Sequence, residues 1–402
     1  MELALGDLKV LDLTHFVAGP ACTKLLADFG ADVLKVERLE GDPARNLGPF
    51  FRDRPHPDQS GVFLHLNTNK RSITLNLKSR AGAQLVEELA RDADVLVESF
   101  RPGVMEGLGL GYDTLRSINP ALVMVSISNF GQSGPYRDLP GTDLVLYSMG
   151  GPMQSNSKVG EYPVRLPGMV TQIHAGYVAA VATLMGFFGS RYKGIGQHID
   201  CSIFESQAMS VDRRLTGLLT HQYHGEIVPR SDVRGAGYPQ GVYPCKDGYV
   251  NVWGGLQFFP LTARMMEMPE MADDPHWATR DAQLDSQRKD EFDVIFLPWI
   301  IERTKLEYLQ MARRAGLLSG ALFTVEDLLQ DPHYQARDFF PEVDHPATGP
   351  VRYVGPIVKM PASPAGFRAP APLLGQHNEE VYHGQLGFTK ADLVRMRRMG
   401  VI

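Results

Sequence analysis

Short apolar runs alternate with helical patterns through the first 130 residues of the chain. The runs Lys9–Leu13 and Asp32–Glu37 flank a helical stretch over 21–29 that stops at Gly30, which is the spacing of a parallel crossover unit. The same alternation predicts strands over 72–77, 93–97 and 122–128 and helices over 81–91 and 112–118. Together these elements predict an α/β fold with an open Rossmann-like sheet.

Several polar and aromatic residues directly follow the predicted strands. In a parallel sheet of this kind, ligands bind beyond the carboxyl ends of the strands, so residues after those ends are candidate ligand contacts. They are the turn 15–18, Arg38 and the segment 99–101. Arg38 and Arg101 could pair with phosphate oxygens, and Phe100 offers a ring face for stacking or for packing in the core.

The pattern changes from about residue 221, where glycine, proline and aromatic residues become frequent. The stretch Gly248–Trp253 alternates as a strand, and helices are expected over 258–268 and 288–315, with the second interrupted at Pro298. This predicts a smaller α+β domain over about 225–330. The proline-rich stretch 361–372 is expected to be extended.

Composition excludes several classes of protein. The 402 residues carry a net charge of −6, with 44% hydrophobic and 21% charged residues, which is ordinary for a globular protein without a bias toward nucleic acid. The three cysteines have no metal-binding spacing. Because the start has no signal-peptide pattern and the apolar stretch 173–190 is short for a membrane span, we expect a buried helix there and a cytoplasmic protein.

Six separate segments stand out as motifs and are, in chain order, 15–20 (HFVAGP), 30–37 (GADVLKVE), 69–73 (NKRSI), 100–103 (FRPG), 163–176 and 194–205. Together, and in this order, they resemble the class III CoA-transferases. The resemblance implies a large Rossmann-like domain built from 1–220 and 331–402, the small domain 225–330 between them, and two subunits interlocked as linked rings. It also implies coenzyme A as a substrate, with no cofactor or metal. The implied CoA contacts are Phe16, Val17, Ala18, Arg38, Leu75, Lys78, Ser99, Phe100 and Arg101.

Two positions depart from the family pattern. Gly107 stands where the family has an arginine, so one phosphate contact is lost or is supplied by Arg101. Gln172 stands where the family has the aspartate that attacks the acyl-CoA thioester. A carboxylate can form a mixed anhydride and then an aspartyl-CoA thioester, whereas the lone pair of an amide nitrogen is delocalised. We therefore expect Gln172 to be inactive as a nucleophile.

The interpretation we favour is a non-catalytic subunit of a heteromeric CoA-transferase. A homologous partner would bear the aspartate, as the related subunits of succinyl-CoA:benzylsuccinate CoA-transferase assemble together. The substrates would be an acyl-CoA, such as succinyl-CoA, and a carboxylic acid, with no nucleic acid or membrane involved. The aspartate partner and the homomeric or heteromeric state are expectations from the resemblance.

Four other interpretations stay open. The nucleophile could be misaligned, with Asp143, Glu161 or Asp200 as the acidic candidates. An acyl-CoA isomerase with different chemistry would need a base such as His174, since Thr142 and Gln172 replace both proton carriers of the racemases. The chain could be an engineered variant of a homodimeric enzyme. It could also be a CoA-ligand sensor or scaffold without a catalytic partner.

Overall fold

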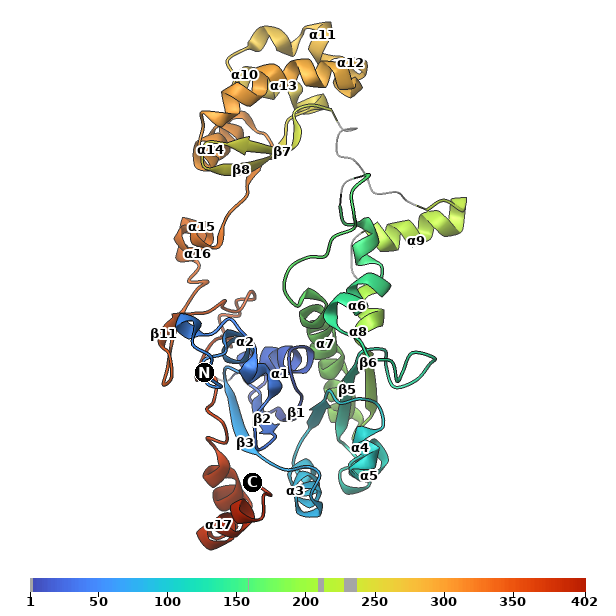
Figure 1. The fold of residues 1–402 in the computed structure, drawn as a ribbon, viewed down its shortest axis with the longest axis vertical. Coiled ribbons are helices and arrows are strands. Elements are labelled where there is room, and N and C mark those ends of the chain that lie inside the picture. The colour runs from blue at the N-terminus through green and yellow to red at the C-terminus, as the bar shows by residue number, and fades with distance from the viewer. Residues whose placement is uncertain (1–2, 158, 209–212, 228–236) are drawn as a thin grey trace. The chain divides into compact units, whose positions relative to one another are not determined.

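The computed structural model describes residues 3–157, 159–208, 213–227 and 237–402. The chain divides into two compact units, the first comprising 1–156, 163–228 and 337–402 and the second 157–162 and 229–336. The N-terminal and C-terminal segments therefore share one unit, drawn in blue to green and in red in Figure 1. The start expected for the small domain includes 228–236, which lie outside the described residues.

A six-stranded parallel sheet forms the centre of the first unit. Its order is β3-β2-β1-β4-β5-β6, which is the order of the Rossmann fold. The predicted α/β Rossmann-like fold is therefore confirmed. The strands are β1 (Lys9–Leu13), β2 (Asp32–Glu37), β3 (Lys70–Thr74), β4 (Val95–Glu98), β5 (Val123–Ser128) and β6 (His198–Ser202).

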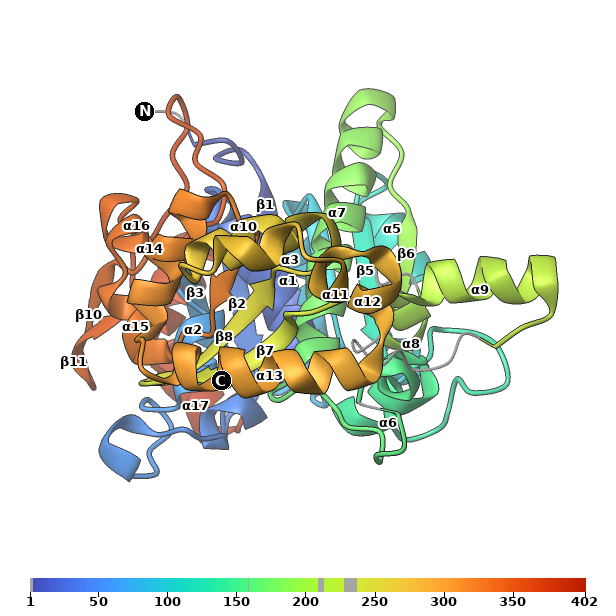
Figure 2. The same ribbon diagram turned by 90° about the horizontal axis from the view of Figure 1, so that it is seen from above.

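Neighbouring residues on each strand point to opposite faces, so the sheet has two cores. Leu11, Leu34 and Leu96 belong to one core, whereas Val10 and Val95 belong to the other. The first core is covered by α3 (Arg80–Arg91), α5 (Tyr112–Ile118) and α17 (Lys390–Arg398), and the second by α1 (Ala18–Asp28) and α7 (Val170–Lys193). Figures 1 and 2 show α1 and α7 beside the sheet.

Shorter elements complete the first unit. They are α2 (Gly61–Leu66), α4 (Val104–Gly107), α6 (Asp143–Met149), α8 (Ile203–Ala208), α9 (Arg213–His224), the hairpin β10 (Glu342–His345) with β11 (Gly349–Arg352), and a π-helix over Glu379–Gln385.

The second unit packs helices on a small antiparallel sheet of β7 (Gln240–Cys245), β8 (Gly248–Trp253) and β9 (Gly320–Ala321). Its core is rich in aromatic residues, among them Phe292 and Phe296, whose rings stack with their centroids 5.5 Å apart. The helices are α10 (Phe259–Met265), α11 (Pro275–Ala278), α12 (Arg280–Leu284), α13 (Ser286–Ile301), α14 (Lys305–Ala315), α15 (Val325–Gln330) and α16 (Pro332–Ala336).

Several predicted element boundaries differ from the structure by two or more residues, and two of these corrections affect the interpretation. Helix α13 continues through Pro298 to Ile301, and the break lies before Thr304, whose side chain and Glu307 form a capping box that starts α14. Strand β3 ends at Thr74 instead of residue 77. Leu75 and Lys78 consequently lie just after a strand end, where ligand contacts are expected.

Helix α7 is only partly buried. It is the one described helix long and apolar enough, by length and composition alone, to cross a bilayer. One side packs on α1, β5 and β6, as in the core of a folded domain. The other side exposes Tyr177, Val181, Met185 and Phe188 by 46–68%. The expectation of a buried helix is therefore right for one face and wrong for the other.

Candidate functional site

The predicted CoA contacts follow strands that end at the same edge of the sheet in the first unit. The turn 15–18 follows β1, Arg38 follows β2, Leu75 and Lys78 follow β3, and the segment 99–101 follows β4. Because β2, β1 and β4 are neighbours and β3 lies beside β2, these loops start along one continuous edge.

Hydrogen bonds join the loops that follow β1, β2 and β4. The His15 N–H donates to Ser99 Oγ at 2.9 Å, and the Phe16 N–H donates to Asp42 Oδ1 at 3.1 Å. The His15 and Phe100 rings pack in a T-shaped arrangement, with their centroids 5.1 Å apart. Phe16 has a φ of 63°, an unusual value for a non-glycine residue, which these contacts hold in place. Contacts with the loops after β2 and β4 therefore fix the conformation of the turn 15–18.

Buried charges support this turn from below. Lys35 Nζ lies 2.8 Å from Asp42 Oδ2 and donates to the carbonyl of Thr14 at 2.9 Å. Burial acts to lower the pKa of Lys35, but the neighbouring carboxylates, led by Asp42, raise it overall, so the ammonium stays charged. Burial, and then Lys35, lowers the pKa of His15 to about 4, so His15 is neutral at pH 7.

A second buried pair lies beside the first. Lys70 Nζ is 3.1 Å from Asp12 Oδ2, and both side chains are fully buried. Desolvation lowers the pKa of Lys70 to about 8. Burial alone would raise the pKa of Asp12, but Lys70 and Lys35 hold it well below its usual range. Removing either partner would leave a buried charge uncompensated, so this network has a structural role.

The predicted contacts divide into accessible and buried residues. Arg38, Lys78 and Arg101 are exposed, and in the described chain their side chains have no hydrogen bond or ion pair within the protein. Phe16 is 48% exposed, whereas Val17 and Ala18 are buried. Leu75 is fully buried in the core, so a ligand could meet only its main chain. Phe100 packs partly against the same core.

The start of α7 lies against the turn 15–18. Val17 packs in a small cluster with Met169 and Ile173, and a Cβ at Gly176 would lie 2.4 Å from the carbonyl oxygen of Ala18. Only glycine permits this approach of the two helices. Position 172 is therefore next to the loop that is expected to hold CoA.

Gln172 occupies the third residue of α7 and is half-buried. Its side-chain amide has no hydrogen-bond partner among the described residues. Its backbone N–H donates to Asp143 Oδ1 at 3.2 Å. Asp143 is the first residue of α6, and Thr142 is the N-cap of that helix. Partial burial raises the pKa of Asp143, although the Gln172 N–H favours its ionised form. A carboxylate thus lies at the start of α7, but on a different helix.

The other acidic candidate in this unit has a different setting. Asp200 lies in β6 and accepts the Gln132 N–H at 2.9 Å. Glu161 belongs to the second unit. Of the acidic candidates for a misaligned nucleophile, Asp143 is the one for which the structure gives a direct contact with residue 172.

Glu98 is a site residue that sequence reasoning did not single out. It is the last residue of β4 and is buried, and its Oε2 accepts the Phe100 N–H at 2.7 Å. Ser126, opposite it on β5, also bonds to Glu98, and Ser126 Oγ lies 2.8 Å from His198 Nε2. Burial raises the pKa of Glu98 to about 7. In the sequence, the signal that could have identified Glu98 is a charged residue at the end of an apolar strand.

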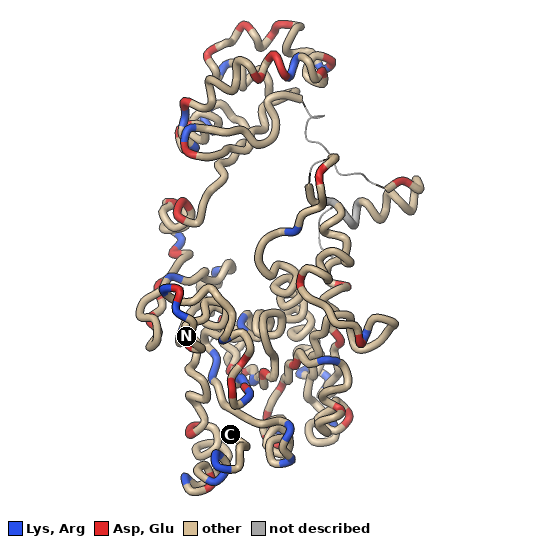
Figure 3. Tube along the Cα trace, viewed as in Figure 1, with Lys and Arg blue, Asp and Glu red and all other residues tan. Residues whose placement is uncertain are grey.

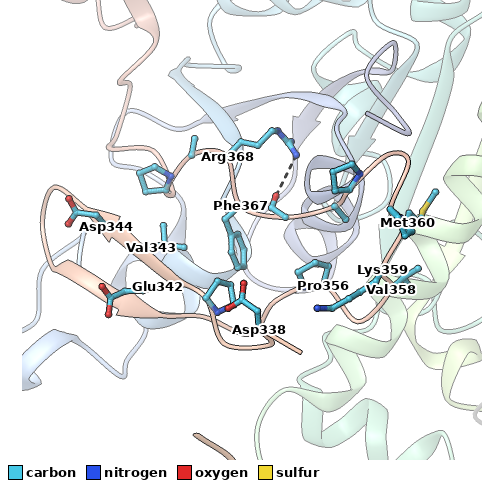
Figure 4. A pocket seen from close by; sticks show the side chains of 17 residues that line it. Asp338, Glu342, Val343, Asp344, Pro356, Val358, Lys359, Met360, Phe367 and Arg368 are labelled. Atoms are coloured by element: carbon cyan, nitrogen blue, oxygen red, sulfur yellow. Dashed lines mark hydrogen bonds between the residues drawn. The ribbon is translucent and has the colours of Figure 1, made fainter. Parts of the chain in front are cut away.

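A pocket of about 650 Å³ lies elsewhere in the first unit. It is formed within 338–370, with the ring of Phe367 between the β10–β11 hairpin and the proline-rich segment (Figure 4). Arg368, on its wall, donates to the carbonyl of Asp28 at 3.4 Å. Asp28 ends α1, whereas the turn 15–18 starts it, so this pocket is separate from the candidate site.

Acidic and basic residues are interspersed through both units (Figure 3). Among the described residues, no group of three or more His, Cys, Asp or Glu side chains could hold a metal ion. The chemistry available at the edge of the sheet is therefore that of exposed arginines and a lysine, backbone N–H groups, and the carboxyl and amide groups at the start of α7.

Comparisons with known proteins identify the family. Residues 5–378 match the model of CoA-transferase family III. Succinyl-CoA–D-citramalate CoA-transferase of Chloroflexus aurantiacus is 34% identical and covers 99% of this chain and 98% of its own length. Formyl-CoA:oxalate CoA-transferase of Streptomyces avermitilis is also 34% identical, over the full length of both chains.

Solved structures agree with these matches. A CAIB/BAIF family protein from Brucella suis superposes with a TM-score of 0.85 at 26% identity, covering 96% of this chain and all of that one. The match spans nearly the whole sequence in the comparisons of both sequence and structure. This chain belongs to CoA-transferase family III, a family of enzymes.

Proposed function

We propose that this chain is a subunit of a CoA-transferase that moves CoA between an acyl-CoA and a carboxylic acid. In this proposal CoA lies along the carboxyl edge of the sheet, with its phosphates near Arg38 and Arg101 and its thiol end toward the start of α7. The names of the relatives support the reaction class, since each pairs an acyl-CoA with an organic acid.

The observation that carries the finer proposal is the amide at position 172. It lies at the start of α7, beside the turn 15–18, where a nucleophile would reach the thioester. CoA transfer through the enzyme needs a carboxylate that attacks the thioester carbonyl and releases the CoA thiolate. The thiolate then attacks the enzyme-side carbonyl of the resulting mixed anhydride, which releases the donor acid and forms an enzyme–CoA thioester. The acceptor acid takes up CoA by the reverse of these two steps, which frees the enzyme's carboxylate. An amide does not perform the first step at neutral pH.

We therefore assign the nucleophile to a homologous partner subunit that bears aspartate at the corresponding position. The exposed apolar face of α7, with Val181 and Met185, supports an obligate assembly of subunits. The interlocked arrangement, the heteromeric partner and the cytoplasmic location are parts of this proposal. The acid substrate is a carboxylic acid, and succinyl-CoA is the donor to test first.

Expression with its native partners, followed by native mass spectrometry, tests the assembly. We expect this chain to be joined to a paralogue of similar length, and the isolated chain to be inactive with succinyl-CoA and a series of acids. In the complex, replacing the partner's aspartate should abolish transfer, whereas Gln172→Ala should lower it only modestly, since one hydrogen bond contributes about 0.5–1.5 kcal/mol.

Three outcomes would change the assignment. Turnover by the isolated chain with a covalent adduct on Asp143 would place the nucleophile in this subunit. CoA binding without any catalytic paralogue would favour a sensor or scaffold. Equal and complete losses from both substitutions would give Gln172 a direct catalytic role.

A further inference from the structure

Arg137 lies against the loop that follows β4, which carries Arg101 and Gly103. A Cβ placed on Gly103 would be 3.5 Å from Arg137 Nη2, and Gly103 has a φ of 84°. Arg137 belongs to the loop after β5. Its guanidinium thus reaches across to the segment after β4 that carries Arg101 and Gly103.

The guanidinium of Arg137 is incompletely paired. Its Nε is buried and has no hydrogen-bond partner among the described residues. Its ion-pair partner is Asp138, at 3.9 Å from Nε, and the Asp138 side chain is 80% exposed. Solvent screens such a pair, and the Arg137 side chain is itself 40% exposed, so its terminal N–H donors are available to another anion.

The segment that carries Arg137 is held in place from behind. The Tyr136 ring packs on Phe130 at 5.7 Å and on Phe204 at 6.3 Å. The Arg137 N–H donates to the carbonyl of Gly134 at 3.3 Å, which closes a turn. An arginine on a supported turn loses less conformational entropy on binding than one on a free loop.

Gly107, one turn further along α4, leaves open space at this surface. No heavy atom lies within 4 Å of a Cβ built there. Helix α4 therefore offers no cation beside Arg101 and Gly103, whereas the loop after β5 brings the guanidinium of Arg137 to Gly103. Guanidinium groups bind phosphate oxygens through two parallel N–H donors.

We propose that Arg137, together with Arg101, binds a phosphate group of CoA across Gly103. This inference rests on the proposed function, because it assigns a residue to the same CoA site. It accounts for how this chain could bind CoA without a cationic side chain at position 107.

Calorimetric titration of the purified assembly with CoA, 3′-dephospho-CoA and pantetheine tests the proposal. Arg137→Ala should weaken CoA binding about 10- to 100-fold, the usual effect of removing a charged hydrogen bond, and leave pantetheine binding unchanged. Arg54→Ala, which removes another exposed arginine of this unit, is the matched control and should change nothing. Adding Gly107→Arg to Arg137→Ala should recover much of the lost affinity.

The ligands separate the possible outcomes. If Arg137→Ala lowers the affinity for CoA but not for 3′-dephospho-CoA, Arg137 contacts the 3′-phosphate. If the substitution lowers the affinity for both ligands, Arg137 contacts the pyrophosphate. Unchanged CoA affinity in Arg137→Ala overturns the inference and leaves the proposed function intact. An equal loss for pantetheine also overturns it, because Arg137 would then act through the fold. If the unmodified assembly binds no CoA, both fail.

Discussion

Replacing Gln172 with aspartate should give this chain a nucleophile of its own. Residue 172 is the third residue of α7, and a negative charge at a helix start gains about 0.3–1 kcal/mol from the exposed N–H groups. Asp143 opposes the new charge, because its Oδ1 already lies 3.2 Å from the backbone nitrogen of residue 172. The variant would therefore hold two neighbouring carboxyl groups.

The size of this repulsion sets the pH profile. Two carboxylates about 5 Å apart repel by roughly 3 kcal/mol at an effective dielectric constant of about 20, which corresponds to about two pKa units. Partial burial raises the pKa of Asp143 as well. Since only an ionised carboxylate attacks, the activity of Gln172→Asp should rise with pH through an apparent pKa that belongs to the pair and lies above the usual value of an aspartate. Adding Asp143→Asn should move that rise to lower pH.

Steady-state transfer from succinyl-CoA to free acids measures the gain, and hydroxylamine trapping with mass spectrometry locates the adduct. Gln172→Asn is the control, since it has the shape of aspartate without a nucleophilic oxygen. Turnover of the unmodified chain at the rate of Gln172→Asp would refute the missing-nucleophile argument. An identical pH profile with and without Asp143→Asn would refute the coupling between the two carboxyl groups.

Two further predictions concern stability, and urea unfolding measures both. The pKa of Glu98 is raised from 4.5 to about 7 in the folded protein, so its contribution to stability is complete below pH 4.5 and is lost as the pH rises through 7. Glu98→Gln should thus be more stable than the unmodified chain at pH 8, by up to about 3 kcal/mol. This difference in stability should shrink toward pH 5, and a difference that does not change with pH would contradict the raised pKa of Glu98. Gly176→Ala should cost about 1–3 kcal/mol by overpacking, because its Cβ would lie 2.4 Å from the carbonyl oxygen of Ala18, whereas Gly189→Ala, whose Cβ would have its nearest neighbour at 3.8 Å, should not destabilise. Equal effects of the two alanines would contradict the close approach of α1 and α7.

Local sequence pattern determined the fold class and much of the element order. The strands Lys9–Leu13 and Asp32–Glu37 and the helix Tyr112–Ile118 were predicted with the bounds that the structure gives. Each is a short segment whose apolar period matches one type of element, so neighbouring residues contain the necessary information. The glutamine at position 172 is likewise a property of the sequence alone, and its amide limits the chemistry of that position however the chain folds.

Contacts between distant segments decided the rest. The sequence did not indicate that Asp143 would meet the start of α7, that Arg137 would lie against Gly103, or that the Leu75 side chain would be buried. The capping box at Thr304, and not Pro298, set the break between α13 and α14. These features depend on how the loops after several strands pack at one edge and how helices end. A local pattern places a residue on an element, but only the packed sheet and helices determine which distant side chain it contacts.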